Sequence, residues 1–143
     1  MADRNRIQGV LQGGALGDAL GWPIEFDDVT EINETQGPDV PPGLVDGDFT
    51  DDTQMTLFTA EGLIRAQQRY NTKGDVHVPS VVRGAYLRWL RTQSGYGRYS
   101  QTLTVDTDNH TLVVRDNDGW LVKEKHLHQR KAPGTTCEGG LHQ

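Results

Sequence analysis

The stretch Thr50-Asp51-Asp52-Thr53-Gln54-Met55 marks the point where an acidic segment with several prolines gives way to a long amphipathic helix. Apolar residues then recur with helical spacing, which predicts a helix from about Thr50 to Tyr70. A Thr followed by Asp is typical of a helix start, because these side chains accept hydrogen bonds from exposed N–H groups and complement the helix dipole. A hydroxyl and two carboxylates are also the oxygen ligands that Mg²⁺ prefers. Simple capping and a hard-cation site are therefore two interpretations of one motif.

A second informative segment runs from Gly17 to Glu25. Asp3 is predicted to cap a first helix that runs to about Gly21, and Pro23 to end it, because the residue before a proline avoids the α region. Glycine recurs every four residues along this helix, which predicts a smooth ridge that another backbone or a ligand can approach closely. Asp18 and Glu25 are either ordinary surface acids, or groups that transfer a proton or orient a metal-bound water.

The remaining pattern predicts mainly helices, in one domain or part of one over residues 1–143. Residues 27–49 are interpreted as a loop, and a third helix is predicted from Pro79 to about Gln93, with Val81 on its apolar face. Residues 100–116 contain two β-prone runs, for which a small hairpin and an irregular loop are equally good interpretations. The turn before Cys137 is not expected to lead into a developed helix, and Cys137 is interpreted as a packing residue.

Composition narrows the functional classes. The net charge of -6 argues against a broad nucleic-acid surface, which needs clustered Lys and Arg. A single cysteine excludes an internal disulfide framework and favours a reducing compartment. The N-terminus lacks the apolar core of a signal peptide, and no apolar run approaches the roughly 20 residues that span a bilayer. The expectation is a soluble cytoplasmic protein with no membrane partner.

The pair His126-x-His128 does not complete a tetrahedral zinc set.

Five motifs, taken in order, resemble those of the ADP-ribosylglycohydrolase family, which includes the dinitrogenase reductase-activating glycohydrolases. They are Gly17-Asp18-x-x-Gly21-x-x-x-Glu25, Thr50-Asp51-Asp52-Thr53-Gln54-Met55, Ala85-Tyr86-x-Arg88-Trp89-Leu90, Gly119-Trp120-Leu121 and Lys131-Ala132-Pro133-Gly134-Thr135. The family often has Arg at the position of Lys131.

The resemblance implies a compact all-α fold and a two-magnesium centre with Thr50, Asp51 and Asp52 among the metal ligands. In such a centre the metals hold the ribose hydroxyls and an attacking water, which suits an oxocarbenium-like transition state. The reaction that it implies is magnesium-dependent cleavage of the glycosidic bond between ADP-ribose and a modified acceptor, such as a protein side chain.

Further site residues are implied by matching motif positions. Glu25 matches the acidic residue near the scissile bond in members that use one, and Asp18 belongs to the helix that frames the site. Gly134 and Thr135 are expected near the ADP-ribose pocket. The implied partners are ADP-ribosylated protein and ADP-ribose itself.

One family feature is not found in this chain: the Asp-x-Asp-Thr/Ser element of the later half, which completes the metal centre. Asp106-Thr107-Asp108 has a similar look but precedes the Pro-Gly-Thr motif and is followed by Asn109. We therefore expect a truncated or split product, a chain that self-associates or pairs with a missing C-terminal half, or a relative that has lost catalysis. Without partner helices, the apolar faces around Met55 and Val81 are expected to be exposed.

Two alternatives to the enzyme follow from the same motifs. The first is a catalytically inactive module that binds ADP-ribose or a protein partner and keeps half of the metal site. The second is a purely structural helical domain whose Thr-Asp-Asp turn is only a cap. Magnesium should stabilise the fold in the first case and leave it unchanged in the second.

Overall fold

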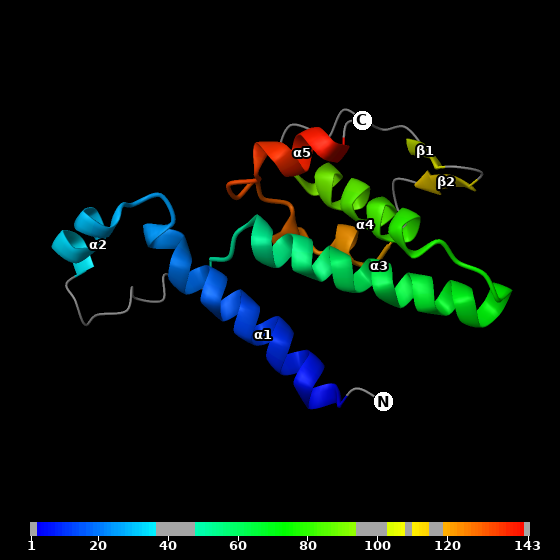
Figure 1. The fold of residues 1–143 in the computed structure, drawn as a ribbon, viewed down its shortest axis with the longest axis horizontal. Coiled ribbons are helices and arrows are strands. Elements are labelled where there is room, and N and C mark those ends of the chain that lie inside the picture. Colours follow the sequence, from blue (N-terminus) through cyan, green and yellow to red (C-terminus); the bar gives the residue numbers. More distant parts are fainter. Residues whose placement is uncertain (1–2, 37–47, 94–102, 108–109, 115–118, 142–143) are drawn as a thin grey trace. The chain divides into compact units, whose positions relative to one another are not determined.

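The computed structural model describes residues 3–36, 48–93, 103–107, 110–114 and 119–141, and the chain divides into two compact units, Met1–Thr53 and Gln54–Gln143. Each unit is described by itself below. The helix α3 (Asp51–Lys73), drawn in Figure 1, begins in the first unit and continues into the second. The expectation of a helical fold is confirmed.

The first unit opens with α1 (Arg4–Gly21), followed by the short 3-10 helix η1 (Trp22–Ile24). The Asp3 carboxylate accepts a hydrogen bond from the Asn5 N–H at 3.0 Å, which confirms the predicted cap. The α-helix ends at Gly21, as predicted, and η1 begins at Trp22. The expected reason is wrong, because Trp22 precedes Pro23 and still has α-region angles, φ −48° and ψ −46°. A Cβ placed on Gly9, Gly13, Gly17 or Gly21 would meet no atom within 4 Å among the described residues, so the close approach along this ridge stays a prediction.

The helix α2 (Val29–Gln36) corrects the interpretation of residues 27–49 as a loop. The Asp28 carboxylate accepts hydrogen bonds from the Thr30 and Glu31 N–H groups at 2.7 and 3.0 Å. The Glu31 carboxylate in turn accepts one from the Asp28 N–H at 2.9 Å. This reciprocal arrangement is a capping box with Asp in place of Ser or Thr, and it starts a helix that the prolines further along the segment obscured. Residues 37–47 lie outside the described part of the chain.

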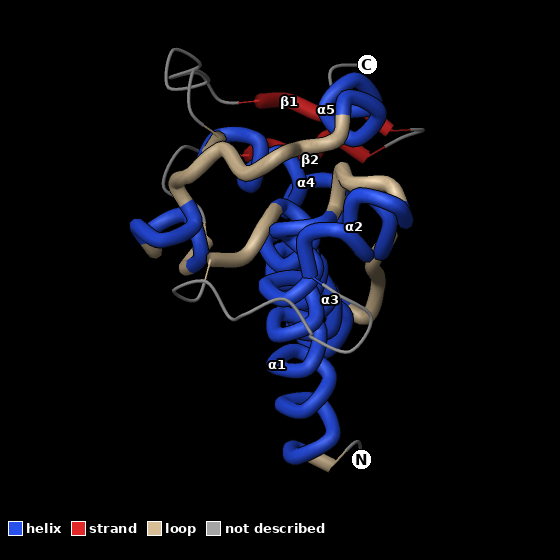
Figure 2. The backbone as a smooth tube through the Cα atoms, turned by 90° about the vertical axis from the view of Figure 1, so that its left-hand side faces the viewer, coloured by secondary structure: helices blue, strands red, loops and turns tan. Residues whose placement is uncertain are grey.

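The second unit is organised around α3 and α4 (Val78–Thr92), which lie side by side in both views (Figures 1 and 2). Their pairing is antiparallel, because Gln54 near the start of α3 contacts Gln93 just after α4, while Gly62 in the middle of α3 approaches Val82 near the start of α4. A Cβ on Gly62 would lie 3.0 Å from the Val82 Cα, so glycine allows the two backbones to come this close. Both helices were predicted, with ends within a few residues of those observed.

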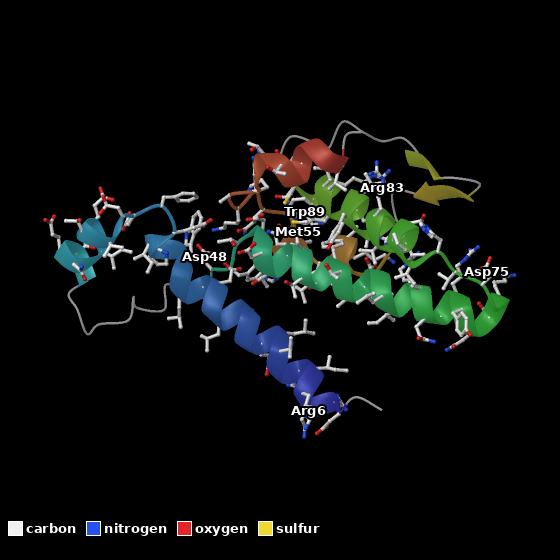
Figure 3. All side chains as sticks on the ribbon, in the orientation of Figure 1. Arg6, Asp48, Met55, Asp75, Arg83 and Trp89 are labelled. Carbon is white, nitrogen blue, oxygen red and sulfur yellow. The ribbon has the colours of Figure 1, made fainter. Side chains whose placement is uncertain are left out.

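The apolar faces of these two helices are covered in part. Phe58 of α3 is buried, as are Ala85 and Trp89 of α4, while Met55 and Val81 are half-buried. Figure 3 marks Trp89 on α4 and Met55 on α3. The expectation that these faces are exposed is therefore wrong where the two helices cover each other. It holds further along, where Leu63, Ile64 and Val78 are 51%, 49% and 39% exposed.

A β-hairpin and a short C-terminal helix test two further predictions from the sequence. The strands β1 (Leu103–Thr107) and β2 (His110–Val114) form an antiparallel pair in which Leu103 lies opposite Val114, so the hairpin interpretation is confirmed. The helix α5 (Thr135–Leu141) does form, contrary to expectation, and Cys137 on it is exposed rather than a packing residue.

The segment between the hairpin and α5 is tied to α3 through a buried carboxylate. It contains η2 (Leu121–Lys123) and η3 (Lys125–Leu127). The Glu61 side chain, 1% exposed, accepts hydrogen bonds from Arg88 Nε at 3.2 Å and from the Trp120 N–H at 3.1 Å. Gly119 has φ +117°, and a Cβ there would lie 2.5 Å from Glu61 Oε1, so only glycine fits this junction.

A helix that crosses a membrane must be both long and apolar. Among the described residues, every helix is either too short or insufficiently apolar to cross a membrane.

Candidate functional site

The Asp18 carboxylate, on α1, holds the turn that begins α3. Its Oδ1 accepts a hydrogen bond from Thr50 Oγ1 at 2.7 Å. Its Oδ2 accepts three more, from the Thr50 N–H at 2.8 Å, the Thr53 N–H at 3.1 Å and Thr53 Oγ1 at 2.5 Å. All of these residues belong to the first unit. A helix start that would otherwise leave N–H groups without partners is thus capped by a residue more than thirty positions earlier in the chain.

These hydrogen bonds determine the electrostatic state of Asp18. Its partial burial alone would raise the pKa of the carboxyl, but the hydrogen bonds from Thr53 and Thr50 outweigh burial and hold the pKa below its ordinary value. The carboxylate is therefore ionised at neutral pH, and both of its oxygens are already engaged. This arrangement favours a role in holding structure over one in transferring a proton.

Thr50 is both a cap and a candidate ligand. The residue is 3% exposed, and its Oγ1 accepts a hydrogen bond from the Asp52 N–H at 3.3 Å, as the capping interpretation predicts. Its single hydroxyl proton points to Asp18. A hydroxyl oxygen has two lone pairs, so one remains after the bond from Asp52.

Asp51 and Asp52 follow in the first turn of α3, where the helix dipole favours negative charge. Asp51 is buried and Asp52 is exposed. With Thr50 they form a set of oxygen donors only, which fits a hard cation in kind. No group of three or more His, Cys, Asp or Glu side chains suited to a metal occurs among the described residues. A metal-binding role for Thr50, Asp51 and Asp52 stays a prediction.

Glu25 lies just beyond η1, in the same unit as this turn. Its N–H bonds the Trp22 carbonyl at 3.4 Å, and its side chain is exposed. Next to it, the Trp22 and Phe26 rings meet edge to face with centroids 6.2 Å apart. An exposed carboxylate near an aromatic pair is accessible to a ligand, and the part of Glu25 in catalysis stays a prediction.

Gly134 and Thr135 lie in the second unit, where α5 begins. Both are exposed, and the Gly134 carbonyl accepts a hydrogen bond from the Glu138 N–H at 3.1 Å. The Arg130 guanidinium binds the Glu138 carboxylate with two hydrogen bonds, of 2.5 and 3.0 Å, and so fixes the approach to this helix. The role of Gly134 and Thr135 in binding ADP-ribose stays a prediction. In the Asp106-Thr107-Asp108 run, Asp106 and Thr107 are on β1 and Asp108 lies outside the described residues.

Sequence reasoning missed one member of this cluster. Thr53 is buried, and both its N–H and its hydroxyl donate to Asp18. Its spacing gave a usable signal: Thr50 and Thr53, three residues apart at a helix start, lie on the same side of the first turn. A single partner can therefore reach both.

Comparison with known proteins defines the class first. The fold is helical, and its longest helix opens on an oxygen-rich turn. The family model described as ADP-ribosylglycohydrolase matches residues 1–143, the whole chain. The chain therefore belongs to the ADP-ribosylglycohydrolase family.

A curated relative adds a more specific likeness. The ADP-ribosylarginine hydrolase Tri1 of Serratia proteamaculans (strain 568) is 35% identical over 89 residues. That alignment covers 61% of this chain and 22% of the relative, so the match spans under a quarter of the relative's length. No solved structure matches the chain.

Proposed function

We propose that this chain takes part in metal-dependent hydrolysis of the glycosidic bond between ADP-ribose and a modified acceptor. The observation that carries the proposal is the Thr50-Asp51-Asp52 turn held by Asp18, in a chain of this family. The similarity to an ADP-ribosylarginine hydrolase makes ADP-ribosylated arginine the acceptor to test first.

Magnesium is the cation that we propose for this site. Thr50 Oγ1 and the carboxylates of Asp51 and Asp52 would hold it, because all three supply the hard oxygen donors that Mg²⁺ takes. When bound, such a cation supplies Lewis-acid stabilisation and a template for hydroxyl and water oxygens. The remaining ligands would come from a further segment or from a second copy of the chain.

We propose different roles for the carboxylates of Glu25 and Asp18. Cleavage of a glycosidic bond commonly uses a carboxyl group placed to give or take a proton. Glu25 is exposed and is the proposed proton-transfer residue. Asp18 is proposed to frame the site, because both its oxygens already accept hydrogen bonds. Gly134 and Thr135 are proposed to contact ADP-ribose.

The experiment measures free ADP-ribose released from an arginine-ADP-ribosylated protein, with Mg²⁺ and with a chelator. The wild-type chain is compared with Asp51→Ala and with Asp75→Ala as a matched control, since Asp75 is exposed between α3 and α4 (Figure 3). We expect metal-dependent release that Asp51→Ala abolishes and Asp75→Ala preserves. Absence of release from a wild-type chain that circular dichroism shows to be folded contradicts catalysis by this chain alone.

A second candidate is a binding module without turnover. It is favoured by the short ligand set, because the described residues supply one hydroxyl and two carboxylates at this site and no larger acidic group. Calorimetry with ADP-ribose distinguishes the two: affinity without product supports the module, and product formation excludes it.

A further inference from the structure

We infer that Asp18 is a positioning residue that sets the direction of the Thr50 hydroxyl, so that a lone pair of Thr50 Oγ1 is presented to the cation of the proposed function, on which this inference rests. Asp18 acts here through Thr50 and does not itself touch the cation or the substrate. The direction of the Thr50 hydroxyl proton is the feature that Asp18 sets.

The two oxygens of Asp18 have separate tasks. Oδ2 accepts the Thr50 and Thr53 N–H groups at 2.8 and 3.1 Å, which caps the helix, and also accepts the Thr53 hydroxyl. Oδ1 accepts the Thr50 hydroxyl at 2.7 Å. An ionised carboxylate has acceptors only, so in each of these bonds the proton belongs to threonine.

The direction of this proton matters for binding a cation. A hydroxyl ligand must turn a lone pair, and not its proton, toward the metal. With the proton held by Asp18 and one lone pair facing the Asp52 N–H at 3.3 Å, the second lone pair of Thr50 Oγ1 remains for a ligand. Groups that orient metal ligands in this way typically change metal affinity by about 10–100-fold when they are replaced.

The substitution Asp18→Asn separates the two tasks. An asparagine of the same shape keeps one oxygen and gains one NH₂ group. Two backbone N–H groups cannot accept a hydrogen bond, so the asparagine oxygen is expected to stay at the Oδ2 position and the NH₂ group to face Thr50 Oγ1. That hydrogen bond is then reversed, and the Thr50 proton is displaced toward the cation position while the cap survives.

The test is calorimetric titration of the full chain with Mg²⁺, and with Mn²⁺ as a second probe. Wild type is compared with Asp18→Asn and with Asp28→Asn, a matched control that changes the carboxylate capping α2 in the same unit. We expect Asp18→Asn to raise the Kd by about 10–100-fold. Asp28→Asn should leave the Kd unchanged.

A double-mutant cycle of Asp18→Asn and Thr50→Val distinguishes an effect transmitted through the Thr50 hydroxyl from a general structural effect on metal affinity. Thr50→Val removes the hydroxyl and keeps the volume. If Asp18 acts through that hydroxyl, Asp18→Asn adds no further loss of affinity in the Thr50→Val background. Amide exchange at the Thr50 and Thr53 N–H groups reports independently whether the cap has survived, and this readout requires no metal.

The outcomes are distinguishable. Wild type that binds neither Mg²⁺ nor Mn²⁺ overturns the proposed metal site, and this inference with it. Wild type that binds while Asp18→Asn binds equally well overturns the inference and leaves the proposed function standing. Additive losses in the cycle also overturn it, because Asp18 would then act by a route other than Thr50.

Discussion

Two polar clusters along α3 differ in how completely they are enclosed. At the start of the helix, Asp18 holds Thr50 and Thr53, and the adjacent Asp52 is exposed. One residue further along, the Gln54 side chain is 0% exposed. Its Oε1 accepts hydrogen bonds from Trp89 Nε1 and Gln93 Nε2, both at 2.9 Å, and its Nε2 donates to the Gln129 carbonyl at 3.0 Å.

The difference separates polar groups that serve packing from polar groups that remain available to a ligand. Both sets of hydrogen bonds satisfy polar atoms away from water, which a stable fold requires. In the enclosed cluster, Gln54, Trp89 and Gln93 are each at most 1% exposed. Next to the cluster at Asp18, by contrast, Asp52 is exposed. Substitutions in the two clusters should therefore have effects of different size and kind.

The largest effect is expected in the enclosed region, at Glu61. Glu61→Leu would leave Arg88, 3% exposed, without its carboxylate and the Trp120 N–H without its acceptor. Breaking a buried ion pair by removing one partner costs about 3–5 kcal/mol. We expect a loss of this size in the free energy of unfolding, measured by urea denaturation.

The matched control is Glu138→Leu, which removes the carboxylate from the more accessible Arg130 pair. Ion pairs near the surface contribute about 0–1 kcal/mol. Equal losses for the two variants would contradict the view that enclosure, and not charge pairing, sets the size of the effect.

Gln54→Leu should have the next largest effect. It removes the acceptor shared by Trp89 Nε1 and Gln93 Nε2, and a buried donor left unsatisfied costs about 1–3 kcal/mol. We expect a total loss of about 2–4 kcal/mol in urea denaturation. Gln67→Leu, at an exposed hydrogen bond on the same helix, should stay within about 0.5 kcal/mol of wild type. A Gln54 variant as stable as the Gln67 variant would show that the enclosed network does not stabilise the fold.

Asp18→Ala should be milder, because it removes a cap and creates no enclosed charge. Loss of a capping side chain costs about 0.5–2 kcal/mol. We expect faster amide exchange at the Thr50 and Thr53 N–H groups, which lose their acceptor, with little change in the middle of α3. Unchanged exchange at both positions would argue against Asp18 as the cap.

The smallest effect concerns pH and the start of α2. The Glu31 and Thr30 N–H groups hold the pKa of Asp28 below its ordinary value of 3.8. A carboxyl whose pKa is lowered by folding stabilises the fold above its unfolded pKa, and this contribution is lost as the pH falls through the folded pKa. We expect α2 to fray on acidification below about pH 4, seen as loss of helical chemical shifts in residues 29–36.

Asp28→Asn is the control for this transition, because asparagine also caps helices but does not titrate. The acid transition of residues 29–36 should therefore shrink in the variant. An acid transition of the same midpoint and amplitude in Asp28→Asn would show that the Asp28 carboxylate does not cause it.

Local signals were enough to predict most of the helices. Asp3, Pro23 and Pro79 act on their own neighbours, so the limits of α1 and α4 could be read directly from the sequence. The Asp28 and Glu31 box is equally local, but it was obscured by the prolines and acidic residues that follow it. Its signal was present in the sequence and was given too little weight.

The contacts that build the site and the core are not local. Asp18 meets Thr50 and Thr53 across 32 and 35 positions, and Glu61 meets the Trp120 N–H across 59. Nothing in the composition of a helix shows that Gln54 or Glu61 is enclosed, since both are usually found at the surface. The Thr50-Asp51-Asp52 turn was found because its own residues are distinctive. The sequence marks Asp18 as a candidate site residue but does not show that it caps this turn.

The position of Gly119 distinguishes between L- and D-residues. Its φ of +117° lies on the side of backbone space that favours D-residues, as the mirror value of −117° favours L-residues. The L-side chain direction is the one that meets Glu61 Oε1 at 2.5 Å, and a D-side chain leaves the backbone in the other direction. A synthetic chain with D-alanine at this position should therefore fold, while its L-alanine counterpart should not dock the segment that begins here. The requirement at this junction is thus for a handedness, which among the genetically encoded residues only glycine can meet.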